Sequence, residues 1–186
     1  MRTGAARIAG MTLAAALALT VTGCKDDPEP PPDFADGPRA TPGASASEAA
    51  AREEILRAYT AYRAAVTAAY NAGNHLHPDL DKHLADPLLA QTRSDLYNLG
   101  RQGLVYKGAI KTNPKVTQVK LSEATPTAII EDCFDLSDYK LIVKSSGAPA
   151  PNPPSLTRFA VNITATRFTG RNWLISNSEM AKERSC

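Results

Sequence analysis

The fold is decided by residues 48–72, EAAAREEILRAYTAYRAAVTAAYNA, in which apolar side chains recur every three or four positions. At about 100° per residue these side chains share one stripe of a helix, and such a stripe is buried against another element. The stripe consists of Ile55, Tyr59, Tyr62, Val66, Ala69 and Tyr70. Because three of its members are tyrosines, the surface that covers the helix must be apolar and must also offer partners to hydroxyl groups.

The ends of this helix carry their own signals. Ser45 with Glu48 fits a capping box, and Gly73 suits the left-handed position that follows a helix. Glu53 and Arg57 form a favourable i,i+4 pair on the polar side. We therefore expect a helix from Glu48 to Ala72.

The N-terminus predicts export. Arg2 and Arg7 precede a short apolar run, Ile8–Val21, which is typical of a secretory signal peptide over residues 1–23. Val21-Thr22-Gly23-Cys24 follows and resembles the lipobox of bacterial lipoproteins, in which the cysteine receives a diacylglyceryl group and acyl chains such as palmitate. The resemblance implies a protein anchored by Cys24 in the cell membrane, on its extracytoplasmic face. The alternative is an ordinary signal peptide whose cysteine is incidental.

Residues 24–46 predict a disordered tether behind this anchor. Six prolines fall within 25–46, with little apolar bulk and a net charge of −3, so the segment is unable to form a packed core. Residues 47–186 then form one domain of 140 residues with a single core. Its acidic and basic residues are mixed along the chain, which speaks against a nucleic-acid partner.

The cysteines of the domain, Cys133 and Cys186, predict a disulfide bond. They are the two that remain if Cys24 carries lipid, and disulfides persist outside the cytoplasm. The bond would close a loop of about 54 residues, which contributes about 4 kcal/mol in the chain-entropy account. A metal pair and a reactive thiol are the rival interpretations.

Beyond Gly73 the pattern predicts two further helices and then strands. The helices are expected over 79–84 and from Asp86-Pro87 to Gly100. The strands are expected over 104–108, 115–123, 127–134, 138–144, 156–168 and 173–176, where the apolar period changes to two. Helices followed by an antiparallel meander give an α+β fold, with the N-terminal helices packed in the concave face of a curved sheet of four to six strands.

This order resembles the nuclear transport factor 2-like superfamily, a cone-shaped cystatin-like α+β fold. The resemblance spans about Ser47–Ser178 and depends on the long first helix, GLVYKG at 103–108, TAIIEDCFD at 127–135 and the closing NWLIS at 172–176. It implies a pocket between helix and sheet, used by some members for isomerase, dehydratase or cyclase chemistry and by others for ligand binding. It also implies pairing of two copies through the open sheet face.

Asp132 is the carboxylate of greatest interest, because alternation puts it on the same face as Ile130 and Phe134. In a concave pocket it would act as a general base, with Tyr62 or Tyr97 donating to an oxyanion. The alternative is a structural role at the sheet rim, with a salt bridge to Arg158 or Arg167, and this alternative is favoured because no partner motif accompanies the acid.

His75, His77 and His83, with Asp79 and Asp81, suggest metal binding, but Pro78 interrupts any helix and a hydrated loop fits better. We expect no metal and no cofactor. The sequence favours a non-catalytic module that binds an unknown protein or small-molecule ligand. The alternatives are a small isomerase- or dehydratase-type enzyme that uses Asp132, and an envelope scaffold.

Overall fold

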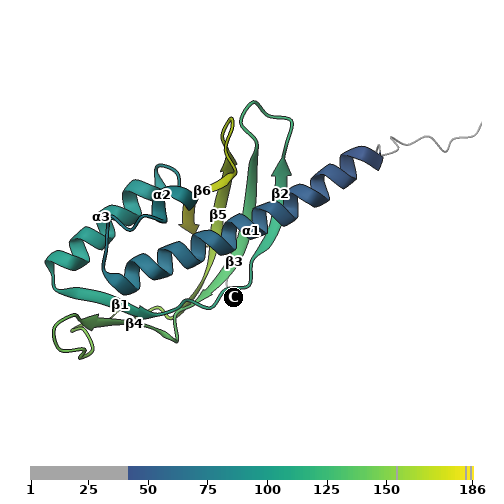
Figure 1. Cartoon of the computed structure of the whole chain (residues 1–186). Coiled ribbons are helices and arrows are strands. Elements are labelled where there is room, and N and C mark those ends of the chain that lie inside the picture. Colours follow the sequence, from purple (N-terminus) through teal and green to yellow (C-terminus); the bar gives the residue numbers. More distant parts are fainter. Residues whose placement is uncertain (1–41, 154, 183, 185) are drawn as a thin grey trace, which may run out of the picture. The chain divides into compact units, whose positions relative to one another are not determined.

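The computed structural model describes residues 42–186 except 154, 183 and 185. Three helices come first, α1 (Pro42–Ala72), α2 (Leu80–His83) and α3 (Leu88–Arg101), and six strands follow. The strands are β1 (Leu104–Gly108), β2 (Lys115–Lys120), β3 (Thr127–Asp135), β4 (Tyr139–Val143), β5 (Arg158–Arg167) and β6 (Trp173–Met180). The chain is therefore an α+β protein, as its sequence predicts (Figure 1).

Helix α1 buries the predicted stripe. Ile55, Tyr59, Tyr62, Val66 and Ala69 are all buried, and Tyr70 is half-buried. The helix ends as expected, because Gly73 adopts φ +61° and its N–H donates to the carbonyl of Tyr70, while the N–H of Asn74 donates to that of Ala69. This pair of bonds is a Schellman motif, which satisfies the last carbonyls of the helix.

The start of α1 differs from the prediction. The helix begins at Pro42, so Ser45 lies inside it rather than capping it, and the end of the predicted 24–46 tether is helical. Proline suits the first position of a helix, and the alanines that follow are strong helix formers. The helix propensity of this segment therefore outweighs the tendency of the nearby prolines to prevent a helix.

The strands form two antiparallel sheets rather than the expected meander. Strands β2, β3, β5 and β6 form one sheet in that order, and β4 leaves it to pair with β1. Because β5 pairs directly with β3 along its whole length, from Thr127↔Thr166 to Asp135↔Arg158, β4 and the loop after it are displaced to the end of the sheet. Figure 1 shows the β1–β4 pair under the C-terminal half of α1.

Strand β1 is connected to α1 through the side chain of Asn71. The amide of Asn71 donates to the carbonyl of Gly108 (2.8 Å) and accepts from its N–H (2.9 Å), so the side chain substitutes for a strand partner. Gly108 has φ +95°, and a Cβ there would lie 1.8 Å from the carbonyl oxygen of Asp138. Glycine is therefore required where β1 ends beside β4.

The hydrophobic core lies between α1 and one face of the four-stranded sheet. Helix α1 contacts the sheet from its edge strand β2 to its other edge strand β6. Ile130, Ile163 and Ile175, from three different strands, are fully buried in this core. No helix within the described part of the chain is long and apolar enough to span a membrane. The predicted signal peptide and Cys24 lie outside the described residues.

Candidate functional site

Asp132 lies in the middle of β3 and faces the core, as the alternation predicts. Its side chain is 5% exposed, and its neighbours on the same face are Ile130 and Phe134. One carboxylate oxygen accepts from the Tyr59 hydroxyl. The other accepts from the backbone N–H groups of Asn113 and Cys133, both at 2.6 Å. The carboxylate thus connects α1, β3 and the segment that enters β2.

These contacts define what the pair can do chemically. Burial raises the pKa of Tyr59, and the hydrogen bond to Asp132 raises it further. Tyr59 therefore stays protonated and donates to the carboxylate at neutral pH. Three protein donors already occupy the two oxygens of Asp132, so about one of the roughly four acceptor positions of the carboxylate is left for a substrate, and it lies in a buried setting.

The structure separates the other residues considered with Asp132. Tyr62 packs its ring 5.9 Å from that of Tyr59 but is not the donor to the carboxylate. Tyr97 is 49% exposed on α3, with its ring against His75. The predicted rim position of Asp132 is wrong, because the residue is buried within β3. The predicted salt bridge is wrong as well, because Arg158 donates to the sulfur of Cys133 and Arg167 pairs with Glu54.

Arg63 lies on α1 beside Tyr62 and Phe134, and the sequence pattern does not single it out as a site residue. Its guanidinium lies 4.6 Å from the ring centre of Phe134 and 5.5 Å from that of Tyr62. Its Nε is buried without a hydrogen-bond partner in the described structure. Because Arg63 follows Tyr59 by four residues, its place on the buried side of α1 was readable from the helical period. Cation–π contact replaces the usual carboxylate partner here.

Three tyrosines gather where α1 meets the β1–β4 pair. The rings of Tyr106 and Tyr139 stack at 4.4 Å with an interplanar angle of 4°, and Tyr70 meets both edge-on. Burial raises the pKa of all three hydroxyls, and nearby Asp95 adds to the effect on Tyr70 and Tyr106. The cluster therefore stays uncharged and supplies aromatic faces with polar edges.

An apolar cavity of about 330 Å³ adjoins this cluster. We call it the tyrosine cavity; its walls come from β1, β4, the segment between β3 and β4 and the proline-rich loop after β4, and include Tyr106, Leu136, Tyr139, Leu141, Ile142 and Leu156. Lys140 adds one charge to the lining. A smaller cavity of about 300 Å³ lies on the α3 side of Tyr70 and Tyr106 and includes Asp95. Burial raises the pKa of the Asp95 carboxyl. Asp132 lines neither cavity.

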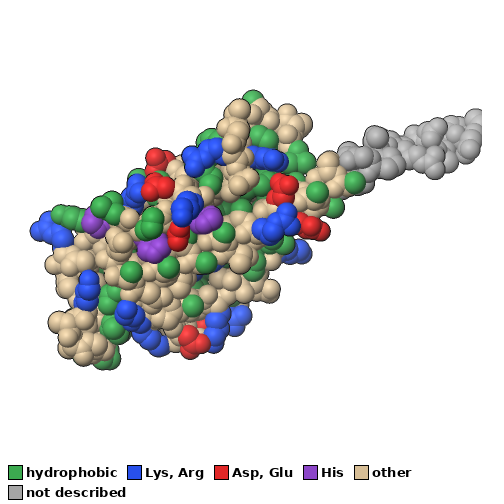
Figure 2. Space-filling view, in the orientation of Figure 1, with side chains coloured by type: hydrophobic (Ala, Val, Ile, Leu, Met, Phe, Trp, Pro, Cys, Tyr) green, Lys and Arg blue, Asp and Glu red, His purple; other side chains and the backbone are tan. Residues whose placement is uncertain are grey.

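The three histidines do not converge. Figure 2 shows them as separate patches on the visible face. His77 lies 4.0 Å from Asp79, and His75 packs on Tyr97. Within the described residues no group of three or more His, Cys, Asp or Glu side chains is arranged to hold a metal ion.

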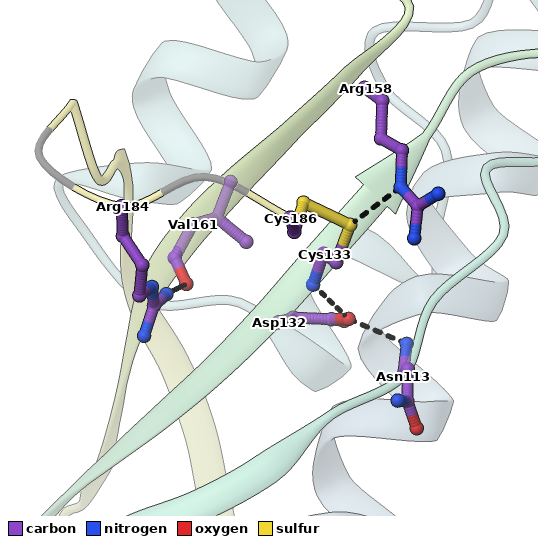
Figure 3. The surroundings of a disulfide bond; sticks show 7 residues. All are labelled: Asn113, Asp132, Cys133, Arg158, Val161, Arg184 and Cys186. Carbon is purple, nitrogen blue, oxygen red and sulfur yellow. Dashed lines mark hydrogen bonds between the residues drawn. A yellow bond between two sulfur atoms is a disulfide. The ribbon is translucent and has the colours of Figure 1, made fainter.

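The predicted disulfide between Cys133 and Cys186 is present, with the two Cα atoms 5.9 Å apart. Cys133 follows Asp132 and so points to the outer face of the sheet, where the C-terminal segment meets it (Figure 3). Arg184 also holds this C-terminal segment against the sheet, since it forms an ion pair with Glu131 and donates a hydrogen bond to the carbonyl of Val161 at 2.9 Å. One end of the outer face is therefore covered by the chain's own terminus.

Comparisons with known proteins give one solved structure to report. The intermembrane space region of the chloroplast protein ARC6 is similar to 69% of this chain over 95% of its own length, with a TM-score of 0.48 and 14% identity. No protein-family model matches the sequence. No curated protein matches it either.

Proposed function

We propose that this protein is a membrane-anchored extracytoplasmic lipoprotein whose folded domain binds a ligand or partner without catalysing a reaction. The observation that carries the proposal is the tyrosine cavity. It combines stacked aromatic rings, aliphatic walls and a single charged side chain, Lys140, which is typical of a site that recognises an apolar molecule.

The arrangement around Asp132 supports binding rather than the isomerase- or dehydratase-type alternative. A general base needs an acceptor oxygen within reach of the substrate proton. Both oxygens of Asp132 are engaged by Tyr59, Asn113 and Cys133, and the carboxylate lies apart from the tyrosine cavity. These hydrogen bonds fit a structural role, in which Asp132 connects α1, β3 and the segment that enters β2.

Export is the second part of the proposal. The Cys133–Cys186 bond supports it, because disulfides persist in oxidising compartments. Membrane attachment through acylated Cys24 follows from the sequence motif. We further propose that residues 47–186 form a nuclear transport factor 2-like cone, and the order of helices before the sheet, with α1 across one sheet face, supports this assignment.

Pairing of two copies through the outer face of the sheet stays a prediction. Thr164 and Asn162 lie on that face, whereas the disulfide-bonded terminus covers the end near Glu131. Sedimentation of the wild type and of Thr164→Arg tests it. A dimer that dissociates in the variant supports the pairing, and a wild-type monomer removes it.

The ligand proposal is tested with the neutral fluorescent probe N-phenyl-1-naphthylamine. Leu156 is 47% exposed in the wall of the tyrosine cavity, and Leu76 is 64% exposed on the loop after α1. Leu156→Arg should abolish saturable probe fluorescence, whereas the matched control Leu76→Arg should leave it unchanged. Equal binding by both variants would remove the tyrosine cavity as the ligand site.

A further inference from the structure

A further cleft differs in chemistry from the tyrosine cavity. It has a volume of about 410 Å³ and lies between α1, α2 and the β5–β6 hairpin. We call it the basic cleft; the argument depends on its residues Arg57, Lys82, His83, Arg167, Asn172 and Trp173. Figure 2 shows Lys and Arg side chains on this face, over the helices and the hairpin.

The charge of the lining favours an anion. The lining contains three cationic side chains, Arg57, Lys82 and Arg167, and one carboxylate, that of Glu54. Glu54 lies 3.6 Å from Arg167, so it offsets one of the three cations. The partners of the other two, Glu53 at 3.7 Å from Arg57 and Asp79 at 2.7 Å from Lys82, are not part of the lining.

Trp173 adds an independent observation. Its side chain is 3% exposed and belongs to the lining of the basic cleft. Its indole nitrogen is buried with no hydrogen-bond partner in the described structure. A buried donor without an acceptor costs free energy, and a ligand acceptor would relieve this cost once the side chains that cover the nitrogen move aside.

The donor set matches a tetrahedral oxyanion. Guanidinium groups bind phosphate oxygens through two parallel N–H donors, and an ammonium group adds a point charge. Arg57 and Arg167 supply the guanidinium groups of the cleft, and Lys82 supplies the ammonium group. From these contacts we propose that the basic cleft binds a phosphate group, either free or as a monoester.

The chain offers a direct readout, because Trp173 is its single tryptophan. Intrinsic fluorescence of the full-length protein, titrated with inorganic phosphate and with glycerol phosphate at low ionic strength, should change saturably. Lys82→Gln and Arg167→Gln should each raise Kd about tenfold, the effect of losing about 1.4 kcal/mol. Arg101→Gln, an exposed cation on α3 outside the cleft, is the matched control and should keep the wild-type Kd.

The two probes distinguish a free phosphate ion from a phosphate monoester. Tighter binding of glycerol phosphate than of inorganic phosphate would assign an esterified source, and equal binding would assign the free ion. If Arg167→Gln lowers stability through loss of the Glu54 pair, Arg57→Gln replaces it, because that side chain is well exposed. No saturable change with either probe, or equal Kd values in wild type and cleft variants, would overturn the proposal.

Discussion

The hydroxyl of Tyr59 donates to the carboxylate of Asp132 and so joins the middle of α1 to the middle of β3 across 73 residues of sequence. Both side chains are buried, Tyr59 at 1% exposure. A polar bond at this depth fixes the register between helix and sheet, because sliding either element would leave a buried group without a partner.

Replacing Tyr59 with phenylalanine should therefore lower the free energy of unfolding by about 1–3 kcal/mol, since it leaves a buried carboxylate oxygen unsatisfied. Urea denaturation followed by circular dichroism measures the change. Tyr97→Phe is the matched control, because Tyr97 is half exposed and should alter stability little. Equal effects of the two substitutions would mean that the Tyr59–Asp132 bond contributes no net stability.

The buried tyrosines predict a loss of stability in alkali. Burial raises the pKa of Tyr59, Tyr70, Tyr106 and Tyr139 above the ordinary value of 10.0. Above about pH 10 the unfolded chain releases these protons while the folded chain keeps them, so the folded state binds more protons and stability falls as pH rises. Below that pH both states are protonated and the contribution is complete.

Urea midpoints at about pH 9 and about pH 11 test this sign. The wild type should lose stability between the two values, and Tyr59→Phe should lose less because one of the shifted hydroxyls is absent. A midpoint that stays constant or rises would contradict the burial of these groups. Tyr97→Phe should follow the wild type.

The Cys133–Cys186 bond predicts a redox-dependent stability. Replacing both cysteines with serine should lower the free energy of unfolding by about 4 kcal/mol, because the unfolded chain gains the entropy of an open loop. Reductant should reproduce this loss in the wild type and have no effect on the double variant. If reductant destabilised both proteins equally, its action would lie elsewhere.

Period-two alternation was enough to place Asp132 on the buried face of β3 and Cys133 on the outer one, and cysteine counting was enough to pair Cys133 with Cys186. The first inference needs only the local geometry of a strand. The second needs only a choice among few cysteines. The sequence does not show that β4 pairs with β1 outside the main sheet. Alternation indicates which face of a strand a residue occupies, but it does not indicate which strand lies beside it.

The same limit explains why the sequence does not show that Tyr59 is the hydrogen-bond partner of Asp132. The helical period puts Tyr59 and Tyr62 on one stripe, but which of them reaches Asp132 depends on how α1 crosses the sheet, a relation between distant segments. Arg63 was overlooked for another reason. A cation on the buried side of α1 conflicts with the binary pattern, and the rings of Tyr62 and Phe134 make its position favourable.

The proposed anchor is tested by Cys24→Ala. Two or more acyl chains, at about 0.8 kcal/mol for each buried methylene, hold a protein on a membrane durably. The wild type should therefore sediment with membranes and incorporate labelled palmitate, whereas Cys24→Ala should do neither. Cys186→Ala is the matched cysteine control and should keep both the label and the membrane fraction, since its sulfur belongs to the disulfide. If the wild type and Cys24→Ala both stay unlabelled and outside the membrane fraction, the cysteine is incidental and the N-terminus is an ordinary export signal.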